Sequence, residues 1–264
     1  MEDSARPLAV VTGASSGIGL ELAKEFAGDG FDLLIAAEDD ELQQAAATLR
    51  GTGADVQAVQ VDLATFDGVE QLYAAITATG RPVEALALNA GVGLGGGFVD
   101  SDLQAEIRLI QLNIVSTVHL AKLVLKDMVT RDSGKVLFTS SIASEMPGSF
   151  QSVYNASKSF VQSFSQAVRE ELKDTGITIT ALMPGPTDTQ FFERAGMLDT
   201  KVGSSKKDSA AKVAKQGYAA LMAGKDKIVA GGVGTKLQGL GGKITPDSVK
   251  AKLHRSMAEP GSGE

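Results

Sequence analysis

The chain has no cysteine and only two histidines among its 264 residues. Without cysteine it can form no disulfide, no thiolate nucleophile and no cysteine-based zinc site. Two histidines, His119 and His254, argue against a multi-histidine metal centre, so we expect no metal. These absences leave oxygen and nitrogen side chains, or an organic cofactor, to carry any chemistry.

A basic surface and apolar targeting segments are also missing. The net charge of -7 argues against a general nucleic-acid partner. The start, Met1-Glu2-Asp3, lacks the basic and apolar regions of a signal peptide, and no uninterrupted apolar run reaches membrane-spanning length. We therefore expect a cytoplasmic protein with no membrane partner. With 43% hydrophobic residues it can bury a full core, and no linker or repeat divides it.

A glycine-rich turn follows the first expected strand, Leu8 to Thr12. The pattern Thr12-Gly13-x-x-x-Gly17-x-Gly19 leads into an amphipathic helix. Glycines let backbone approach a pyrophosphate, and a helix N-terminus offers free N–H groups and a positive dipole. No Gly-Lys-Ser/Thr follows, so the pattern does not fit a nucleoside triphosphate loop. It predicts a dinucleotide site, with a plain tight turn as the alternative.

The same letters contain a competing motif. Gly13 to Gly17 matches GxSxG, the nucleophile elbow of α/β-hydrolases, with Ser15 as nucleophile. That function needs a catalytic histidine, yet His119 lies in an apolar helical pattern and His254 in a tail. A serine hydrolase is therefore the remote alternative.

An acidic run follows the second expected strand, Asp32 to Ala37. Glu38 stands about twenty positions beyond the glycine turn, where a dinucleotide fold binds the adenosine ribose hydroxyls. The alternative is that Glu38 caps the next helix, and we interpret Asp39 to Glu41 as such capping residues. A carboxylate here would repel a 2′-phosphate, which slightly favours NAD over NADP.

Further strands are expected at Val56 to Val61, Ala85 to Leu88, Lys135 to Ser140, Ile177 to Met183 and Lys227 to Val229. Their carboxyl ends carry polar or glycine residues, and ligands bind at that edge of a parallel sheet. Between them, residues 103–128 predict one long helix, kinked or subdivided. In it the amide of Asn113 must be satisfied by neighbouring backbone or by an active-site water, and His119 is expected to pack.

A tyrosine and a lysine lie four residues apart in the expected helix 153–170. Tyr154 and Lys158 share one face, with Cβ atoms roughly 5–6 Å apart. The ammonium is expected to lower the pKa of the phenol toward the working range. Ser141, at the end of the preceding strand, can donate to a substrate oxygen, whereas Ser140 points elsewhere.

Together these motifs resemble the short-chain dehydrogenase/reductase family of classical length, over roughly residues 6 to 230. The resemblance rests on the glycine turn, Asp62, Asn89-Ala90-Gly91, Asn113, Ser141, Tyr154-x-x-x-Lys158 and Pro184-Gly185. It implies an α/β fold: a single Rossmann-type, doubly wound parallel sheet of about seven strands with helices on both faces. It also implies a homodimer or homotetramer built through the helices that contain Asn113 and Tyr154.

The resemblance implies a role for each matching residue. Tyr154 would exchange a proton with an alcohol or carbonyl oxygen while hydride passes to or from nicotinamide. Lys158 would hold the nicotinamide ribose, Ser141 the substrate oxygen, and Asn113 a water that links Lys158 to solvent. The implied cofactor-binding positions are Gly13, Ser15, Ser16, Gly17, Ile18, Gly19, Glu38, Asp62, Leu63, Asn89, Ala90, Gly91, Tyr154, Lys158, Pro184, Gly185, Thr187 and Thr189.

The chain also departs from the family pattern. Ala37 stands where members that prefer NAD often have aspartate, so only Glu38 speaks for NAD. Residues 91–98, 186–210 and the tail 231–264 are the expected substrate-facing segments, with an apolar lid at Phe191, Phe192, Met197 and Leu198. We expect an oxidoreductase for a small, fairly apolar alcohol or ketone; a non-catalytic dinucleotide-binding or scaffold protein is the alternative.

Overall fold

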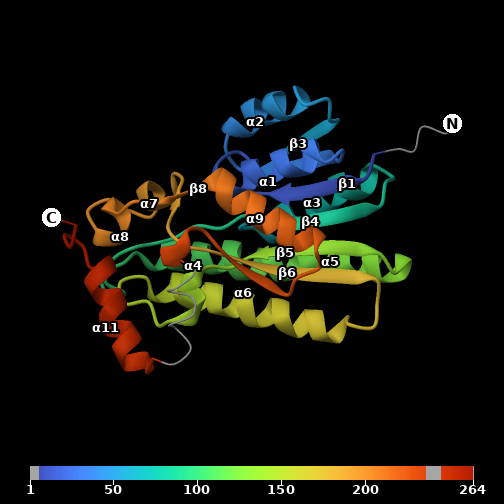
Figure 1. Cartoon of the computed structure of the whole chain (residues 1–264). Coiled ribbons are helices and arrows are strands. Elements are labelled where there is room, and N and C mark those ends of the chain that lie inside the picture. Colours follow the sequence, from blue (N-terminus) through green and yellow to red (C-terminus); the bar gives the residue numbers. More distant parts are fainter. Residues whose placement is uncertain (1–5, 236–244, 264) are drawn as a thin grey trace.

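The structure is a computed structural model that describes residues 6–235 and 245–263. Its centre is a sheet of seven parallel strands in the order β3-β2-β1-β4-β5-β6-β9 (Figure 1). The strands are β1 (Leu8–Thr12), β2 (Asp32–Ala37), β3 (Val56–Gln60), β4 (Val83–Leu88), β5 (Gly134–Thr139), β6 (Ile177–Pro184) and β9 (Lys227–Ala230). The order reverses between β1 and β4, which makes the doubly wound sheet expected from the sequence.

The strands form where the sequence has short apolar runs. Every residue of β1 and β2 is buried, as expected for strands covered on both faces, while β3 and β9 at the edges are partly exposed. The register pairs Val10 with Leu34 on one side and with Leu86 on the other, so the central strands share one apolar layer. Strands β1 and β2 have the predicted bounds, and the bounds of the other five differ from the prediction by one or two residues, as helix and strand ends usually do.

Helices cover both faces of the sheet (Figure 1). One face carries α1 (Gly17–Gly28), α2 (Glu41–Arg50) and α9 (Ala210–Met222), and its core includes Phe26 and Leu221. The other carries α3 (Phe66–Ala78), α4 (Leu103–Ile110), α5 (Ser116–Arg131) and α6 (Ser152–Glu171), and its core includes Leu120 and Phe138. Burial of these two apolar layers holds the helices on the sheet.

The long helical segment is subdivided, as the sequence predicted. A π-helical turn, η1 (Gln111–Val115), separates α4 from α5 and contains Asn113. Such turns are frequent at functional sites because they interrupt the regular hydrogen-bond ladder. By length and composition alone, Leu103–Arg131 could cross a membrane. Its buried side chains, among them Leu112 and Met128, pack on the sheet, so we interpret it as a core element of this fold.

Short elements gather beyond the carboxyl ends of the strands. They are η2 (Ile142–Glu145), β7 (Thr187–Asp188), α7 (Phe191–Arg194), α8 (Lys201–Ser204), β8 (Asp208–Ser209) and α11 (Asp247–Ala258). β7 pairs with β8, and α7, α8 and α11 lie at one end of the molecule (Figure 1). Of the tail 231–264, residues 236–244 and 264 lie outside the described residues, and residues 233–235 are helical.

Candidate active site

A cavity of about 770 Å³ runs along the carboxyl edge of the sheet. It extends from the turn after β2, past the end of β5, to α11. The expected catalytic residue Ser141 lines it, together with nearly all of the expected cofactor positions: Gly13, Ser15, Ser16, Gly17, Ile18, Glu38, Asp62, Leu63, Asn89, Ala90, Gly91, Tyr154, Lys158, Pro184, Gly185, Thr187 and Thr189. Among the expected site residues, Gly19 and Asn113 are the two that stand behind its wall.

The glycine turn forms a cradle that larger residues would fill. Gly13 and Gly17 have φ angles of 64° and 55°, which side-chain-bearing residues rarely adopt. A Cβ on Gly17 would lie 2.9 Å from the Thr189 side chain, across the cavity edge. A Cβ on Gly19 would meet the Gly13 carbonyl oxygen at 2.0 Å, so Gly19 serves the close packing of α1 on the turn.

Asn89 and Thr12 hold this turn in place. The Asn89 side chain donates to the carbonyl oxygens of Thr12 and Gly13, at 3.2 and 3.3 Å. The Thr12 hydroxyl accepts from the backbone N–H groups of Asn89 and Ala90, both at 3.0 Å. Two strands that are adjacent in the sheet are thus cross-linked at the point where the cavity begins.

An arginine that the sequence did not reveal bridges two expected adenosine contacts. Arg108 on α4 donates to Glu38 at 2.5 Å and to the two Asp62 oxygens at 2.9 and 3.2 Å. Partial burial raises the pKa of Asp62, but hydrogen bonds from Arg108 and from the Ala64 backbone outweigh it and hold the pKa below its usual value. Arg108 lies 70 residues from Glu38 in the sequence, so no local pattern could show the pair.

The turn after β2 does not cap α2 as expected. Asp40 stands at the N-cap but makes no side-chain capping bond, and its carboxylate accepts from Gln60 at 2.8 Å. Asp39 turns toward the glycine loop, where it accepts from the Ser15 hydroxyl at 3.0 Å and faces Arg194 at 3.6 Å. The capping interpretation is therefore wrong for Asp39 and Asp40, because stronger partners reach these carboxylates from other segments.

The hydrogen bond between Ser15 and Asp39 argues against a hydrolase nucleophile elbow at Ser15. Ser15 donates to Asp39, whereas a serine nucleophile needs an adjacent base such as histidine. His119 bonds Glu70 at 2.6 Å and stacks on Phe66, and His254 bonds the Ser149 carbonyl oxygen. Both histidines are described, and neither contacts Ser15; His119 is the packing residue that the sequence predicted.

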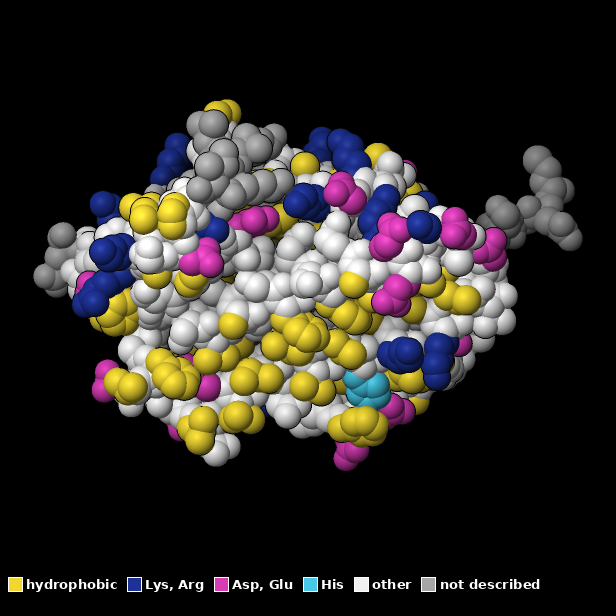
Figure 2. Space-filling view, turned by 90° about the horizontal axis from the view of Figure 1, so that it is seen from below, with side chains coloured by type: hydrophobic (Ala, Val, Ile, Leu, Met, Phe, Trp, Pro, Cys, Tyr) yellow, Lys and Arg dark blue, Asp and Glu magenta, His cyan; other side chains and the backbone are white. Residues whose placement is uncertain are grey.

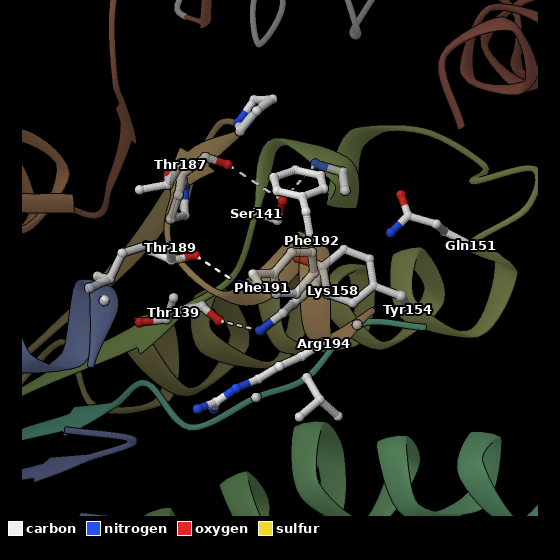
Figure 3. Close-up of a pocket in the computed structure, with 18 of the residues that line it drawn as sticks. Thr139, Ser141, Gln151, Tyr154, Lys158, Thr187, Thr189, Phe191, Phe192 and Arg194 are labelled. Carbon is white, nitrogen blue, oxygen red and sulfur yellow. Dashed lines mark hydrogen bonds between the residues drawn. The ribbon is translucent and has the colours of Figure 1, made fainter. Parts of the chain in front are cut away.

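Lys158 is buried at the floor of the cavity. Its ammonium donates to the Thr139 carbonyl oxygen at 3.0 Å (Figure 3). Burial lowers the pKa of Lys158 to about 8. A Cβ on Gly91 would lie 3.2 Å from Lys158 Nζ and 3.0 Å from Asn113 Oδ1, so the bare Gly91 backbone fits between these two side chains.

Tyr154 lies beside Lys158, with the ammonium 5.9 Å from the ring centroid. The phenol is buried, and burial raises the pKa of Tyr154 to about 12, opposed only by a hydrogen bond with Ser141. This direction is opposite to the depressed pKa that the sequence predicted, because desolvation of the buried phenol is the dominant cause of the shift. The Ser141 hydroxyl also bonds the Pro184 carbonyl oxygen at 3.4 Å, which places it where β5 and β6 end.

Asn113 is satisfied by protein groups. Its amide oxygen accepts from Val92 N–H at 2.9 Å, and its amide nitrogen donates to the Val92 carbonyl oxygen at 2.9 Å and to Ser157 at 3.0 Å. Of the two alternatives, the structure shows bonding to neighbouring backbone. Asn113 thereby ties the loop after β4 to η1 and α6, directly behind Lys158.

The segments expected to face the substrate contribute unequally. Phe191 and Phe192 line the cavity, and the Phe191 ring lies 5.2 Å from the Tyr154 ring (Figure 3). Met197 is buried in a small core cluster that also contains Phe192, and Leu198 is exposed, so only the two phenylalanines of the expected lid line the cavity. Helix α11 closes the far end through Leu253, His254 and Met257, among other residues.

Gln151 is a second residue that the sequence analysis missed. It is only 7% exposed, lines the cavity three residues before Tyr154, and points its carboxamide inward (Figure 3). Its nearness to the tyrosine motif was the available signal. A lone glutamine before a helix, however, is more often an ordinary surface residue.

Known proteins share the sequence pattern and the fold of this chain. Residues 7–197 match the sequence model of a family described as short chain dehydrogenase. The oxidoreductase UcpA of Salmonella typhimurium is 31% identical over 188 residues, which are 70% of this chain and 71% of that protein.

Two solved structures share the fold. A short-chain dehydrogenase from Sphingobium yanoikuyae in complex with NADPH is 29% identical, with a TM-score of 0.79 over 91% of this chain and 96% of that one. A short-chain dehydrogenase/reductase from Burkholderia phymatum in complex with NAD is 26% identical, with a TM-score of 0.79 over 86% and 90%. The first of these relatives was thus solved with NADPH and the second with NAD.

Proposed function

The chain belongs to the short-chain dehydrogenase family, and on that premise we propose that it transfers a hydride between a nicotinamide dinucleotide and a small, fairly apolar alcohol or ketone. The observation that carries the proposal is the convergence of Ser141, Tyr154 and Lys158 in one cavity with the glycine cradle. A pure binding protein has no use for a buried phenol beside an ammonium. The non-catalytic scaffold is therefore the second choice.

The residues present fit a dinucleotide. The cradle at Gly13 and Gly17 leaves the space that a Cβ would fill, next to the N-terminus of α1. Glu38 and Asp62 offer acceptors at the adenosine end, and Lys158 and Thr189 line the other end. When bound, the nicotinamide would supply the hydride acceptor or donor.

In this proposal Tyr154 moves the proton and Ser141 orients the oxygen. For ketone reduction, the neutral phenol that a pKa of about 12 implies is a ready donor to the developing alkoxide. For alcohol oxidation, the phenolate would take the hydroxyl proton as hydride leaves the carbinol carbon, which requires a lower pKa of Tyr154. Lys158 and a positively charged nicotinamide ring would both favour the phenolate.

The first experiment is a fluorescence titration with NADH and NADPH, followed by a panel of ketones and alcohols with the tighter cofactor. Replacing Tyr154 by Phe should lower kcat at least 1,000-fold and leave cofactor affinity within about threefold, since only the proton donor is removed. Retained turnover in Tyr154→Phe would refute the mechanism. Tight cofactor binding without turnover of any substrate would favour the scaffold.

For the cofactor we propose a modest preference for NAD(H). Glu38, Asp62 and Asp39 carry three negative charges at this end of the cavity, against the two positive charges of Arg108 and Arg194. A 2′-phosphate would enter this acidic end at an electrostatic cost.

A cytoplasmic location stays a prediction. We further propose that the protein forms a homodimer. Figure 2 shows apolar side chains across the face on which α6 lies. Ile107 on α4, Val115 in η1 and Phe160 on α6 are all more than two-fifths exposed. Exposed apolar side chains gathered on one face are typical of an interface.

A further inference from the structure

Gln151 is a buried polar group that the proposed proton and hydride transfer does not use. Its backbone is fixed: the N–H donates to the Gly148 carbonyl oxygen at 3.0 Å, and the carbonyl oxygen accepts from Asn155 N–H at 2.9 Å. Its side chain makes no capping bond to α6. Within residues 6–235 and 245–263, no group bonds its carboxamide. Its amide atoms are not among the fully buried polar atoms that lack a partner, so water in the cavity can reach them, and a ligand that displaces this water would take its place as the partner of the amide.

The loop before Gln151 is held in a strained shape that fixes the position of the Gln151 backbone. Phe150 has a φ of 64°, unusual for a residue with a large side chain. Its carbonyl oxygen accepts from Gly96 N–H at 3.0 Å, and its ring lies 5.4 Å from the Arg255 guanidinium of α11. Ser149 also bonds the Ala251 carbonyl oxygen at 3.0 Å. Contacts with two other segments thus hold Gln151 in the cavity wall.

The position of the Gln151 carboxamide relative to Tyr154 limits which part of a substrate it can bind. In Figure 3, Gln151 lies on the opposite side of Tyr154 from Thr139 and Thr189, which mark the cofactor end. The cavity wall includes the apolar side chains of Phe191, Phe192 and Met146, together with His254, which bonds the Ser149 carbonyl oxygen. Gln151 immediately precedes α6, and both Gln151 and Tyr154 line the cavity. A ligand atom that bonds Gln151 would therefore belong to the part of the substrate that extends from the carbon held at Tyr154 away from the cofactor end.

We propose that Gln151 is a specificity-determining residue that binds a second, uncharged oxygen of the substrate. The preferred substrates are then ketones or alcohols with a carbonyl, hydroxyl or ester oxygen in the part that extends away from the cofactor end, such as 1,2-diketones, hydroxyketones and 3-oxoesters. A carboxamide suits this role because it donates to a carbonyl and also accepts from a hydroxyl. A site that leaves such an amide unpaired discriminates against plain ketones. The inference rests on the proposed hydride transfer.

The test compares matched ketones in matched variants. For the dicarbonyl compounds 2,3-hexanedione and ethyl 3-oxobutanoate, kcat/KM is divided by the value for the plain ketone 2-hexanone, in wild type, Gln151→Leu and Gln190→Leu. Differences in intrinsic reactivity cancel when these ratios are compared between proteins. Gln190 is the control because it lines the same cavity while its amide oxygen is already bonded by Arg194 at 2.6 Å.

We expect Gln151→Leu to lower both ratios roughly five- to tenfold, the effect of one neutral hydrogen bond. Turnover with the plain ketone should stay within about twofold of wild type, and Gln190→Leu should leave the ratios unchanged. Equal loss on all three ketones would show a structural role. Unchanged ratios in Gln151→Leu would show that the amide does not contact the second oxygen; either result overturns the inference.

Other results would show that the proposed hydride transfer is wrong, independently of the role of Gln151. If wild type reduces none of the three ketones with either cofactor, hydride transfer to this substrate class is refuted. Calorimetry with the diketone and cofactor-loaded Tyr154→Phe, with and without Gln151→Leu, then still decides the amide's role. Binding that is weaker by at least fivefold in the double variant supports it, and equal binding rejects it.

Discussion

Arg108 reaches from α4 to the turn after β2, where its guanidinium donates to Glu38 at 2.5 Å. The same guanidinium also binds Asp62, so one cation is shared by two carboxylates at the adenosine end of the cavity. These carboxylates raise the pKa of Arg108 and keep it charged. In the proposed cofactor complex, the preference between NAD(H) and NADP(H) depends on whether Arg108 stays with Glu38 or turns to a 2′-phosphate.

Replacing Glu38 by Gln should shift the cofactor preference toward NADPH. The change removes one negative charge and frees one side of Arg108 to bind a phosphate. We expect the ratio of the NADH and NADPH dissociation constants to move at least tenfold toward NADPH, measured by fluorescence titration at fixed ionic strength. Asp40→Asn, on the same turn but outside the cavity wall, is the control and should change the ratio by less than twofold. An unmoved ratio in Glu38→Gln would mean that this carboxylate does not select the cofactor.

Lys158 should make the cofactor-free protein more stable as the pH rises from 8 to 10. The pKa of Lys158 is about 8 in the folded protein and 10.5 for an ordinary exposed lysine, as in the unfolded chain. Between these two pH values the unfolded chain therefore binds more protons than the folded one. Stability therefore increases with pH in this window, by on the order of 1–3 kcal/mol. Above pH 10 the raised pKa of Tyr154 acts with the opposite sign, because the folded state then holds the extra proton.

Urea unfolding at pH 7.5 and pH 9.5 measures this gain. Lys158→Met should abolish most of it, since no ammonium remains to be neutralised on folding. Lys173→Met is the matched control, because Lys173 is exposed and pairs with Glu170 on the surface. If both variants keep the wild-type pH dependence, the buried ammonium is not its source.

The fold and the clustering of the candidate residues could be predicted because both depend on local sequence patterns. Apolar runs that end at glycines indicated the central strands, and the spacing of Tyr154 and Lys158 placed both on one helix face. The sequence also predicted that the long helical segment is kinked or subdivided, though not that the interruption is a π-helical turn at Asn113. These features depend on neighbours within a few residues.

Long-range contacts could not be predicted in the same way. Arg108 meets Glu38 across 70 residues, and Asp39 meets Arg194 from another part of the chain. The pKa of Tyr154 follows from how deeply the fold buries it, a property of packing that the tyrosine–lysine spacing does not contain. Met197 shows the same limit, since an apolar residue near the cavity can as easily join the core.

Replacing Phe160 by Glu should weaken the proposed dimer. Phe160 is 42% exposed on α6, and a carboxylate buried at its place would lack a partner. Light scattering coupled to size exclusion should show a dimer for wild type and mostly monomer for Phe160→Glu at micromolar concentration. Leu198→Glu introduces the same charge at an exposed position outside this face and should leave the dimer intact. A monomeric wild type would refute the proposal directly.

Gly93 gives a way to move Phe191 without changing it. A Cβ on Gly93 would lie 2.3 Å from the tip of the Phe191 ring, so Gly93→Ala must displace that ring from its place beside Tyr154. Misplacing a side chain that shapes the substrate site by about 1 Å can lower activity severely, and we expect kcat/KM to fall roughly tenfold. Cofactor affinity should change less than twofold.

Two further variants separate the ring displacement from a general effect of the added methyl group. Gly93→Ala combined with Phe191→Leu relieves the overlap, because the shorter side chain does not reach the new Cβ, and activity should exceed that of Gly93→Ala alone. Gly28→Ala adds the same methyl group where nothing lies within 4 Å and should leave kcat/KM unchanged. If Gly93→Ala keeps wild-type activity, the position of Phe191 beside Tyr154 does not matter for turnover. If the double variant is no better than the single one, the loss comes from the loop backbone and the ring is not its cause.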